Sequence, residues 1–136
     1  RKTVGKLGLI VLIVTTILGE IVIKNIVQRP RPYDALAGIY DILPNPGGFS
    51  FPSTQAAITA ALATLYILFL PKTFRAYFFI TLAMLTAFDR IYMGHHYPSD
   101  VLAGAIMGII TALLCWYTLV KHSKLPLLKT SHAKRT

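Results

Sequence analysis

The sequence is short of the residue types that most soluble domains place on their surface. Of its 136 residues only 14% are charged, against about 25% in an average globular domain, and only five are Asp or Glu. It has one cysteine, so an internal disulfide is impossible and the cysteine and histidine spacing of a zinc site is missing. These shortages exclude an ordinary soluble domain, a disulfide-stabilised domain and a cysteine-based metal site.

Hydrophobic residues take the place of the missing charges and make up 54% of the chain. They lie in long blocks, and a helix needs about 20 such residues to cross a bilayer. The expected fold is an all-α integral membrane helical bundle that forms a single domain. The domain covers residues 1–136. We predict four membrane-spanning helices in it, at about 7–27, 53–70, 76–93 and 98–120, followed by a basic tail at 121–136.

Small residues recur at helical spacing in two of these spans. Gly104 and Gly108 lie four residues apart in the last span, and the second span carries Ala56, Ala60 and Ala63. Membrane helices approach one another closely where side chains are small. We therefore expect close helix packing along these two spans.

The 14 Lys and Arg residues give the chain a net charge of +9. Most of them lie at the N-terminus, in the 71–75 turn and in the tail, where no acidic residue occurs. Because cytoplasmic loops retain such charges, we expect a cell-membrane protein with both termini in the cytoplasm and the 28–52 and 94–97 loops outside. Aromatic residues are not interleaved with these cations, so membrane lipids are the expected partners and nucleic acid is not.

The predicted outer side nevertheless keeps several ionisable residues. Four cations and two adjacent histidines fall there: Lys24, Arg29, Arg31, Arg90, His95 and His96. Such residues at the edge of membrane spans are energetically costly and usually functional. A transporter or channel would place them near the middle of the bilayer, whereas these gather at one face. The pattern favours a site at the membrane surface.

The first part of this site is the segment that leaves the first span. Pro30 and Pro32 disfavour helical geometry for the residues before them, so Arg31 can fold back toward Lys24. Glu20 lies four residues before Lys24 and is its expected ion-pair partner. Two cations would then face one space.

The second part is the start of the second span. Ser53 is a natural N-cap residue. The free amide groups of the first helical turn, together with the helix dipole, form an anion site. The sequence therefore predicts a second anion-binding element on the same face.

The third part is the turn between the last two spans. Pro98 suits the first turn of a helix, and Asp100 in that turn can reach back to His96. A carboxylate on one ring nitrogen fixes the tautomer and leaves the other nitrogen free to attack. With Arg90 six residues before His96, the pattern predicts a phosphate pocket that contains a nucleophile.

Together these parts resemble the motifs of the type 2 phosphatidic acid phosphatases, membrane lipid phosphatases that share a phosphate site with vanadium haloperoxidases. The family pattern is Lys, six residues, Arg-Pro; then Pro-Ser-Gly-His; then Ser-Arg, five residues, His, three residues, Asp. Its first motif matches in full at Lys24 and Arg31-Pro32. Its second matches at Pro52 and Ser53 only.

The third motif matches at Arg90, His96 and Asp100, and differs at its first position, where Asp89 replaces serine. The matching region runs from residue 24 to residue 100. Three motifs in the family order, on a face that charge placement had already singled out, make the resemblance specific.

The resemblance implies a role for each matching residue. His96 would attack phosphorus and form a phosphohistidine, and Asp100 would orient it. Cations and the start of the second span would hold the phosphoryl oxygens through Lys24, Arg31, Arg90, Ser53 and Thr54. No metal ion or other cofactor is implied, which agrees with the nature of phosphoryl transfer, where positioning and charge stabilisation dominate.

Gln55 stands where the family has the histidine that protonates the leaving group. Loss of a general acid typically costs about 10²–10⁴ in rate, most for a lipid alcohol and least for a diphosphate. Three interpretations stay open: an inactivated chain, an enzyme restricted to diphosphates, or one in which His95 supplies the proton. Thr54 in place of glycine is a mild change, whereas Asp89 places a carboxylate beside Arg90 and would weaken its hold on phosphate.

We therefore expect a metal-independent membrane lipid phosphatase or diphosphatase. By resemblance, its substrate would be undecaprenyl or another polyprenyl diphosphate, phosphatidylglycerol phosphate or phosphatidic acid. The alternative is a catalytically silent membrane protein that binds lipid phosphates in the same pocket. Bacterial members of the family usually have six spans and this chain begins near their third, so either two helices are missing or this is a compact four-helix member.

Overall fold

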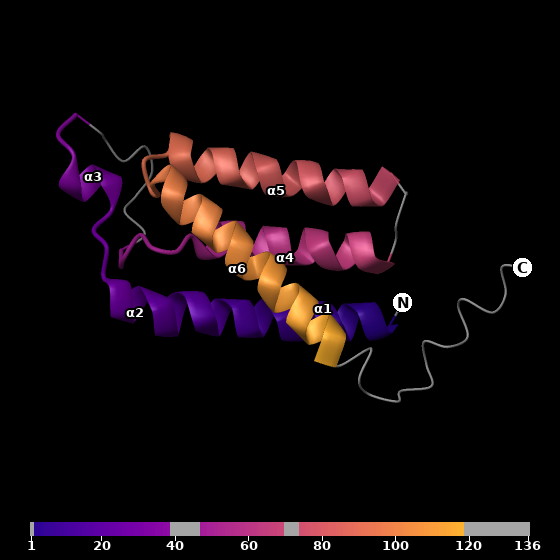
Figure 1. Cartoon of the computed structure of the whole chain (residues 1–136). Helices are drawn as coiled ribbons and strands as arrows, with labels where there is room; N and C mark the ends of the chain where they lie inside the picture. Colours follow the sequence, from indigo (N-terminus) through magenta and orange to yellow (C-terminus); the bar gives the residue numbers. More distant parts are fainter. Residues whose placement is uncertain (1, 39–46, 70–73, 119–136) are drawn as a thin grey trace, which may run out of the picture.

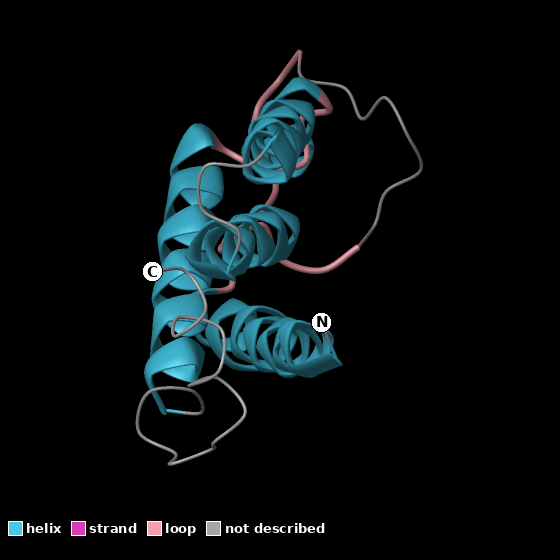
Figure 2. Ribbon diagram, turned by 90° about the vertical axis from the view of Figure 1, so that its right-hand side faces the viewer, coloured by secondary structure: helices cyan, strands magenta, loops and turns pink. Residues whose placement is uncertain are grey.

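The computed structural model describes residues 2–38, 47–69 and 74–118, and within these ranges the chain is helical apart from its turns and loops (Figure 1, Figure 2). α1, the π-helix η1 and α2 continue one another as a single rod, which packs with three further long helices. The predicted all-α bundle is confirmed. Its elements are α1 (Lys2–Thr16), η1 (Ile17–Ile23), α2 (Lys24–Val27), α3 (Pro32–Ala35), α4 (Thr54–Phe69), α5 (Phe74–Tyr92) and α6 (Pro98–Trp116).

The first rod ends at Val27. Gln28 takes a left-handed conformation, with φ 49° and ψ 37°, and its N–H donates to the carbonyl of Lys24 at 3.0 Å. Such a residue commonly ends a helix, and Pro30 and Pro32 prevent the helix from resuming at once. The chain therefore turns across the end of the bundle and enters the short α3.

η1 widens the first rod shortly before its end. The N–H of Lys24 donates to the carbonyl of Gly19, five residues back, which is the π-helical pattern. Gly19 packs against α4 so closely that a Cβ there would lie 2.7 Å from Thr54 Oγ1. Hydrophobic periodicity did not predict this segment. π-Helical turns often occur at functional sites, and this one carries Glu20.

α6 crosses α4 at a very short distance. A Cβ at Gly104 would overlap the carbonyl oxygen of Ser53, and a Cβ at Gly108 would overlap that of Ala57. The expected close packing of the two helices rich in small residues is confirmed. It also fixes the start of α6 against the start of α4.

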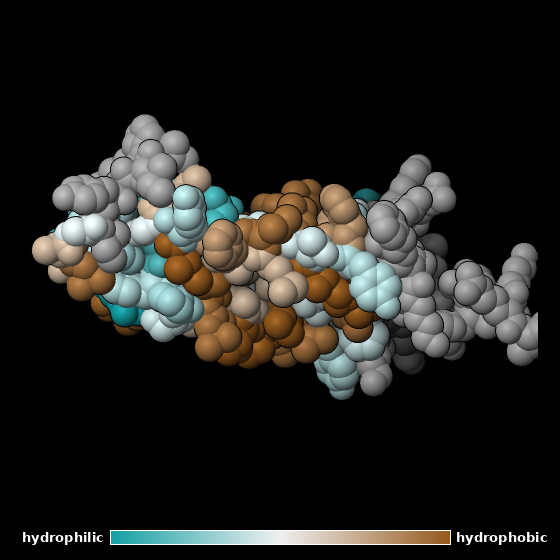
Figure 3. All heavy atoms as spheres, turned by 90° about the horizontal axis from the view of Figure 1, so that it is seen from above, coloured by the Kyte–Doolittle hydropathy of each residue, from teal (hydrophilic) through white to brown (hydrophobic). Residues whose placement is uncertain are grey.

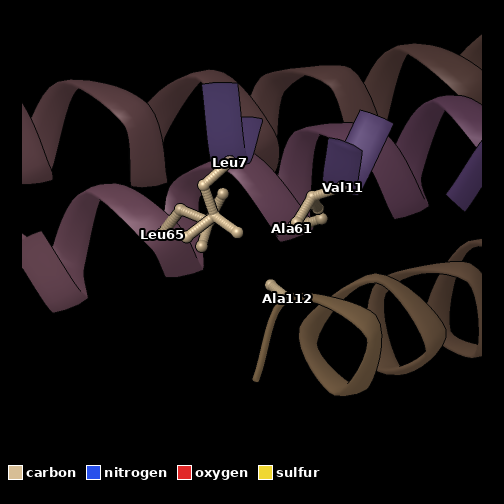
Figure 4. Packing of buried hydrophobic residues seen from close by; sticks show 5 residues of the cluster. All are labelled: Leu7, Val11, Ala61, Leu65 and Ala112. Carbon is tan, nitrogen blue, oxygen red and sulfur yellow. The ribbon is translucent and has the colours of Figure 1, made fainter. Parts of the chain in front are cut away.

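The buried apolar core is small and lies where α1, α4 and α6 meet. Most other large apolar side chains face outward, as for Met84, Phe88 and Leu102, which are 68%, 65% and 64% exposed. Figure 3 shows one such face, with apolar residues gathered over the middle of the molecule. Exposed apolar surface of this kind is typical of contact with a membrane or with another protein. The core itself (Figure 4) consists of Leu7, Val11, Ala61, Leu65 and Ala112.

Two segments of the described chain, residues 4–35 and 98–116, are long and apolar enough to cross a bilayer. α4 is also apolar but has 16 residues. Together with the outward-facing apolar surface, these segments identify a helical membrane protein. Spans at α4 and α5 stay a prediction.

The segments that carry the predicted site residues lie at one end of the bundle (Figure 1). The ends of α2 and α5 and the starts of α4 and α6 meet there, whereas the starts of α1 and α5 and the ends of α4 and α6 lie at the other end. The motifs that are separate in the sequence thus share one end of the fold. The basic tail and most of the 71–75 turn lie outside the described residues.

Candidate functional site

A cavity of about 230 Å³ lies at this end, between the end of the first rod, the start of α4 and the turn before α6. Most of the predicted site residues line it, while Ser53 and Asp100 do not. The lining combines three cations, two imidazoles and one carboxylate with smaller residues, and consists of Glu20, Lys24, Arg31, Gly47, Thr54, Gln55, Arg90, His95 and His96.

Lys24 is almost fully buried at the end of the first rod, with 7% of its surface exposed. Its ammonium donates to Glu20 Oε1 at 2.7 Å, which confirms the expected ion pair across one turn. A lysine ammonium has three donor hydrogens, so it can hold this carboxylate and still donate into the cavity. The pair keeps in place a charge that would be costly to bury alone.

Arg31 is buried and ties separate segments together. Its Nε donates to Gly48 O at 3.2 Å, its Nη2 to Gly47 O at 2.9 Å and its Nη1 to His95 O at 3.1 Å. A guanidinium has five N–H groups, and among the described residues these contacts use three of them, so two can donate to a ligand. The expected return of Arg31 toward Lys24 is confirmed, because both line the same cavity.

Arg90, in the last turn of α5, reaches the cavity but shares its charge with a neighbour. Its Nε donates to Asp89 Oδ2 at 2.8 Å, and its Nη2 contacts the same oxygen. The expected carboxylate beside Arg90 is confirmed. A bound phosphate would have to compete with Asp89 for this guanidinium.

His96 is fixed by a main-chain contact that the sequence did not indicate. Its Nδ1 lies 2.7 Å from the carbonyl oxygen of Ser50. A carbonyl oxygen can only accept a hydrogen bond, so we assign the ring hydrogen to Nδ1. In the neutral ring Nε2 then keeps a lone pair that is not engaged by this contact.

The surroundings of Asp100 correct the sequence expectation. Its Oδ2 lies 3.9 Å from His96 Nδ1, which is too long for a hydrogen bond. The reason is that this fully buried carboxylate has two closer donors. Arg29 Nη1 donates to Oδ1 at 2.6 Å, and the N–H of Tyr97 donates to Oδ2 at 3.0 Å. These two bonds replace the expected bond to His96.

Arg29 is a residue of this end to which none of the sequence motifs gives a role. Its guanidinium lies 3.8 Å above the centre of the Tyr97 ring and donates to Ser99 Oγ at 2.8 Å. Its place among the few cations of this side was a signal that could have drawn attention to it. Its partner Asp100, however, is 71 residues away, and no spacing rule connects them.

Ser53 directly precedes α4, in the N-cap position that the sequence predicted. Its hydroxyl does not cap the helix, because within the described part of the chain Oγ is buried and has no hydrogen-bond partner. Its N–H donates to the carbonyl of Asp100 at 3.0 Å, and its own carbonyl lies against Gly104. The start of α4 thus holds an unused hydroxyl beside Thr54.

The pKa of the His96 imidazole is lowered from 6.5 to about 4. Burial is the largest cause. The positive charge of Arg31, and then those of Lys24 and Arg90, act in the same direction, while the hydrogen bond to Ser50 opposes them. A neutral imidazole surrounded by cations at pH 7 is suited to attack an anionic phosphorus centre.

Both residues considered for proton transfer lie at the cavity. Gln55 is in the first turn of α4, and its exposed side chain lines the cavity. His95 is buried and lines the same cavity, with its ring edge-on to Tyr33 at 6.1 Å between centroids. Gln55 and His95 therefore line the same cavity.

Comparison with known proteins identifies similar chains. The family model of the PAP2 superfamily matches residues 5–124. An undecaprenyl-diphosphatase from Sulfolobus acidocaldarius is 33% identical, over 79% of this chain and 52% of its own length. A lipid A 4'-phosphatase from Bacteroides thetaiotaomicron is 35% identical, over 63% of this chain and 40% of its own. This chain thus spans about half the length of these curated relatives.

A solved structure shows the same fold. The crystal structure of LpxE from Aquifex aeolicus is similar with a TM-score of 0.73 and 30% sequence identity. The match covers 85% of this chain and 68% of that chain.

Proposed function

Because this chain belongs to the PAP2 superfamily, we propose that it removes a phosphate group from a membrane lipid phosphate or a polyprenyl diphosphate. The observation that carries the proposal is the cavity that Lys24, Arg31 and Arg90 share with a neutral His96. Curated relatives named as an undecaprenyl-diphosphatase and a lipid A 4'-phosphatase support the same class of substrate.

In the proposed reaction the Nε2 lone pair of His96 attacks phosphorus. A P–N bond forms as the P–O bond to the leaving group breaks, and water then cleaves the P–N bond to release inorganic phosphate. The three cations stabilise the phosphoryl oxygens, where negative charge is spread in the transition state. Thr54 lines the cavity at the start of α4 and would donate a hydrogen bond to the same oxygens.

Gln55 favours a diphosphate as the substrate. A lipid monophosphate loses an alkoxide, which must gain a proton, whereas a polyprenyl diphosphate loses a polyprenyl phosphate, a much weaker base. The amide of Gln55 can donate a hydrogen bond to the leaving oxygen but cannot protonate it. Where a proton is needed, His95 is the candidate donor.

An apolar groove of about 270 Å³ between α4, α5 and α6 supports a substrate with a hydrocarbon tail. Small residues such as Ala56, Ala83 and Ala87 line it. Gln55 of the cavity directly precedes Ala56 of the groove, and Arg90 lies one helical turn beyond Ala87. A tail in the groove would bring its phosphate to the cations.

We propose further that all four long helical units span the cell membrane, with the cavity on its outer face and both termini in the cytoplasm. The support is the unequal distribution of charge, since the cations of the opposite end have no acidic neighbours in the sequence.

A second candidate function is binding of lipid phosphates without turnover. Gln55 favours it, because the proton donor of the family motif is replaced while the phosphate-binding cations are kept. Such a protein would hold the same ligands in the same cavity and release no phosphate.

The test is release of inorganic phosphate by the purified chain in detergent micelles with excess EDTA. A polyprenyl diphosphate and phosphatidic acid are offered side by side. We expect release, faster from the diphosphate, and none by His96→Ala. Thr86→Ala is the matched control, because it removes a hydroxyl that donates to the carbonyl of Leu82 within α5, away from the cavity lining, and it should keep the wild-type rate.

The outcomes separate the two candidates. No release from either lipid, with binding retained, would establish the silent binder. Equal release by the wild type and His96→Ala would overturn the assignment of the nucleophile.

A further inference from the structure

We propose that Ser50 is a positioning residue that holds the His96 imidazole in its reactive tautomer through its main-chain carbonyl. This inference rests on the proposed function for its consequence in catalysis, but its structural content can be tested without turnover. Ser50 belongs to none of the motifs that identified the site. It lies three residues before Ser53, in the segment that leads into α4.

The first step is the contact itself. His96 Nδ1 lies 2.7 Å from Ser50 O, and both residues are buried. A carbonyl accepts and never donates, so this contact is compatible only with a hydrogen on Nδ1. The opposite tautomer would set a lone pair against a carbonyl oxygen and would place the hydrogen on Nε2, which could then not attack.

The second step is that Ser50 is itself held twice. Its N–H donates to the carbonyl of Arg29 at 2.8 Å, and its hydroxyl donates to the carbonyl of Pro30 at 3.1 Å. The two acceptors belong to the two residues that come just before Arg31 in the chain. One network therefore connects the turn that aims a phosphate-binding guanidinium with the ring that would attack the phosphate.

The third step is that the alternative partner is engaged elsewhere. Asp100 accepts from Arg29 and from the N–H of Tyr97, and it is 3.9 Å from His96 Nδ1. The group closest to the Nδ1 hydrogen is thus a neutral carbonyl. A neutral acceptor fixes the tautomer without adding a negative charge close to the incoming phosphate.

The chemistry explains why this contact would matter in the reaction. As Nε2 forms its bond to phosphorus, the ring becomes positively charged and its Nδ1–H becomes a stronger donor. Hydrogen bonds from charged donors are roughly twice as strong as neutral ones. The Ser50 carbonyl would therefore stabilise the transition state more than the ground state, which is the requirement for catalysis.

The first experiment uses the wild-type protein and needs no turnover. Nitrogen-15 NMR of the imidazole groups in detergent micelles reports which ring nitrogen carries the hydrogen, and loss of one signal in His96→Ala assigns His96 among the four histidines. We expect an Nδ1-protonated neutral ring at pH 7. An Nε2-protonated ring would overturn the proposal whatever the activity of the chain.

The second experiment compares Ser50→Ala with Ser50→Thr. The alanine variant loses the hydroxyl that fixes the carbonyl, so the Nε2-protonated tautomer should appear and kcat should fall about fivefold, the effect of one ordinary hydrogen bond, with little change in KM. The threonine variant keeps the hydroxyl and should restore both. Thr86→Ala controls for loss of a hydroxyl elsewhere.

The outcomes distinguish the roles. A change of tautomer in Asp100→Asn but not in Ser50→Ala would assign the positioning role to the carboxylate. A Ser50→Ala protein with lower activity but unchanged tautomer would overturn the role given to the Ser50 hydroxyl in holding the carbonyl, and would leave that hydroxyl a merely structural role. If the wild type releases no phosphate, the proposed function fails while the tautomer measurement still decides the role of Ser50.

Discussion

The carboxylate of Asp100 is bonded to the guanidinium of Arg29 at 2.6 Å, whereas the ring of His96, four residues before Asp100, is 3.9 Å from it. The ion pair joins the segment that leaves the first rod to the first turn of α6. Asp100 is fully buried, and the Arg29 side chain is 35% exposed. The pair therefore links two segments that are distant in the sequence, at the end of the bundle where the cavity lies.

Arg29→Gln should destabilise the bundle because it leaves the Asp100 carboxylate buried without its cation. We expect a loss of about 2–3 kcal/mol, below the range for fully buried pairs because Arg29 is partly exposed. Reversible unfolding in mixed detergent micelles, followed by helicity, measures it. In the double variant with Asp100→Asn the loss should be smaller than the sum of the single losses. Additive losses would show that the two residues do not act as a pair.

Gln55→His should raise the rate with lipid monophosphates far more than with diphosphates. A general acid contributes about 10²–10⁴ in rate, and only the alkoxide leaving group needs it. Phosphate release from phosphatidic acid and from a polyprenyl diphosphate, measured on the same preparation, gives the ratio. Gln55→Asn is the control, since it shortens the amide without adding an acid. If the wild type is active and the ratio of the two rates does not change in Gln55→His, position 55 is not the site of the proton donor.

The imidazole of His96 should titrate near pH 4 and not near its ordinary value of 6.5. Because the folded-state pKa is lowered, the unfolded chain binds a proton between pH 6.5 and about 4 that the folded chain does not bind. Titration of His96 therefore leaves the free energy of unfolding unchanged above pH 6.5 and lowers it as the pH drops from 6.5 to about 4. NMR titration of His96 measures the pKa directly. A value near 6.5 would mean that water and counter-ions reach the ring freely.

Asp89→Ser should strengthen binding of the phosphate group by releasing Arg90. The two side chains are 25% and 35% exposed, and exposed pairs of this kind contribute at most about 1 kcal/mol. We therefore expect KM to fall by about two- to fivefold. Asp34→Ser removes an exposed carboxylate of α3 and controls for the change in net charge. An equal effect of both variants would point to overall charge and not to competition at Arg90.

Ala60→Phe should fill the apolar groove, which Ala60 lines. KM should rise for a long-chain polyprenyl diphosphate and stay unchanged for a short, water-soluble diphosphate, because only the long tail needs the groove. Leu85→Phe adds a ring at a 60% exposed position of α5 outside the groove lining and serves as the control. Equal effects on both substrates would show that the lipid tail does not bind in the groove.

The sequence was informative where the physics is local or compositional. The Glu20–Lys24 pair follows from helical spacing, the contact of Asp89 with Arg90 follows from adjacency, and the packing at Gly104 follows from residue size. Each of these can be inferred from a single short segment. The same reasoning brought the separate cations to one end of the bundle, because membrane crossings alternate in direction.

The missed features depend on contacts between distant segments. Ser50 acts through a main-chain carbonyl, which every residue has, so no residue type reveals it. Asp100 was assigned to His96 because the two are four residues apart, but Arg29 competes for the same carboxylate from across the bundle. Spacing alone cannot rank a local partner against a distant one that carries a full charge.

The contact of Gly104 and Gly108 with the backbone of α4 has a consequence for how such a protein could change during evolution. At these two positions main chain of α6 packs directly against main chain of α4, which sets the separation between the starts of the two helices. Residues along the groove can then be exchanged for larger or smaller ones without altering that separation. Under the proposed function, the lipid tail could therefore vary from one descendant to the next while the geometry of the cavity residues is inherited unchanged.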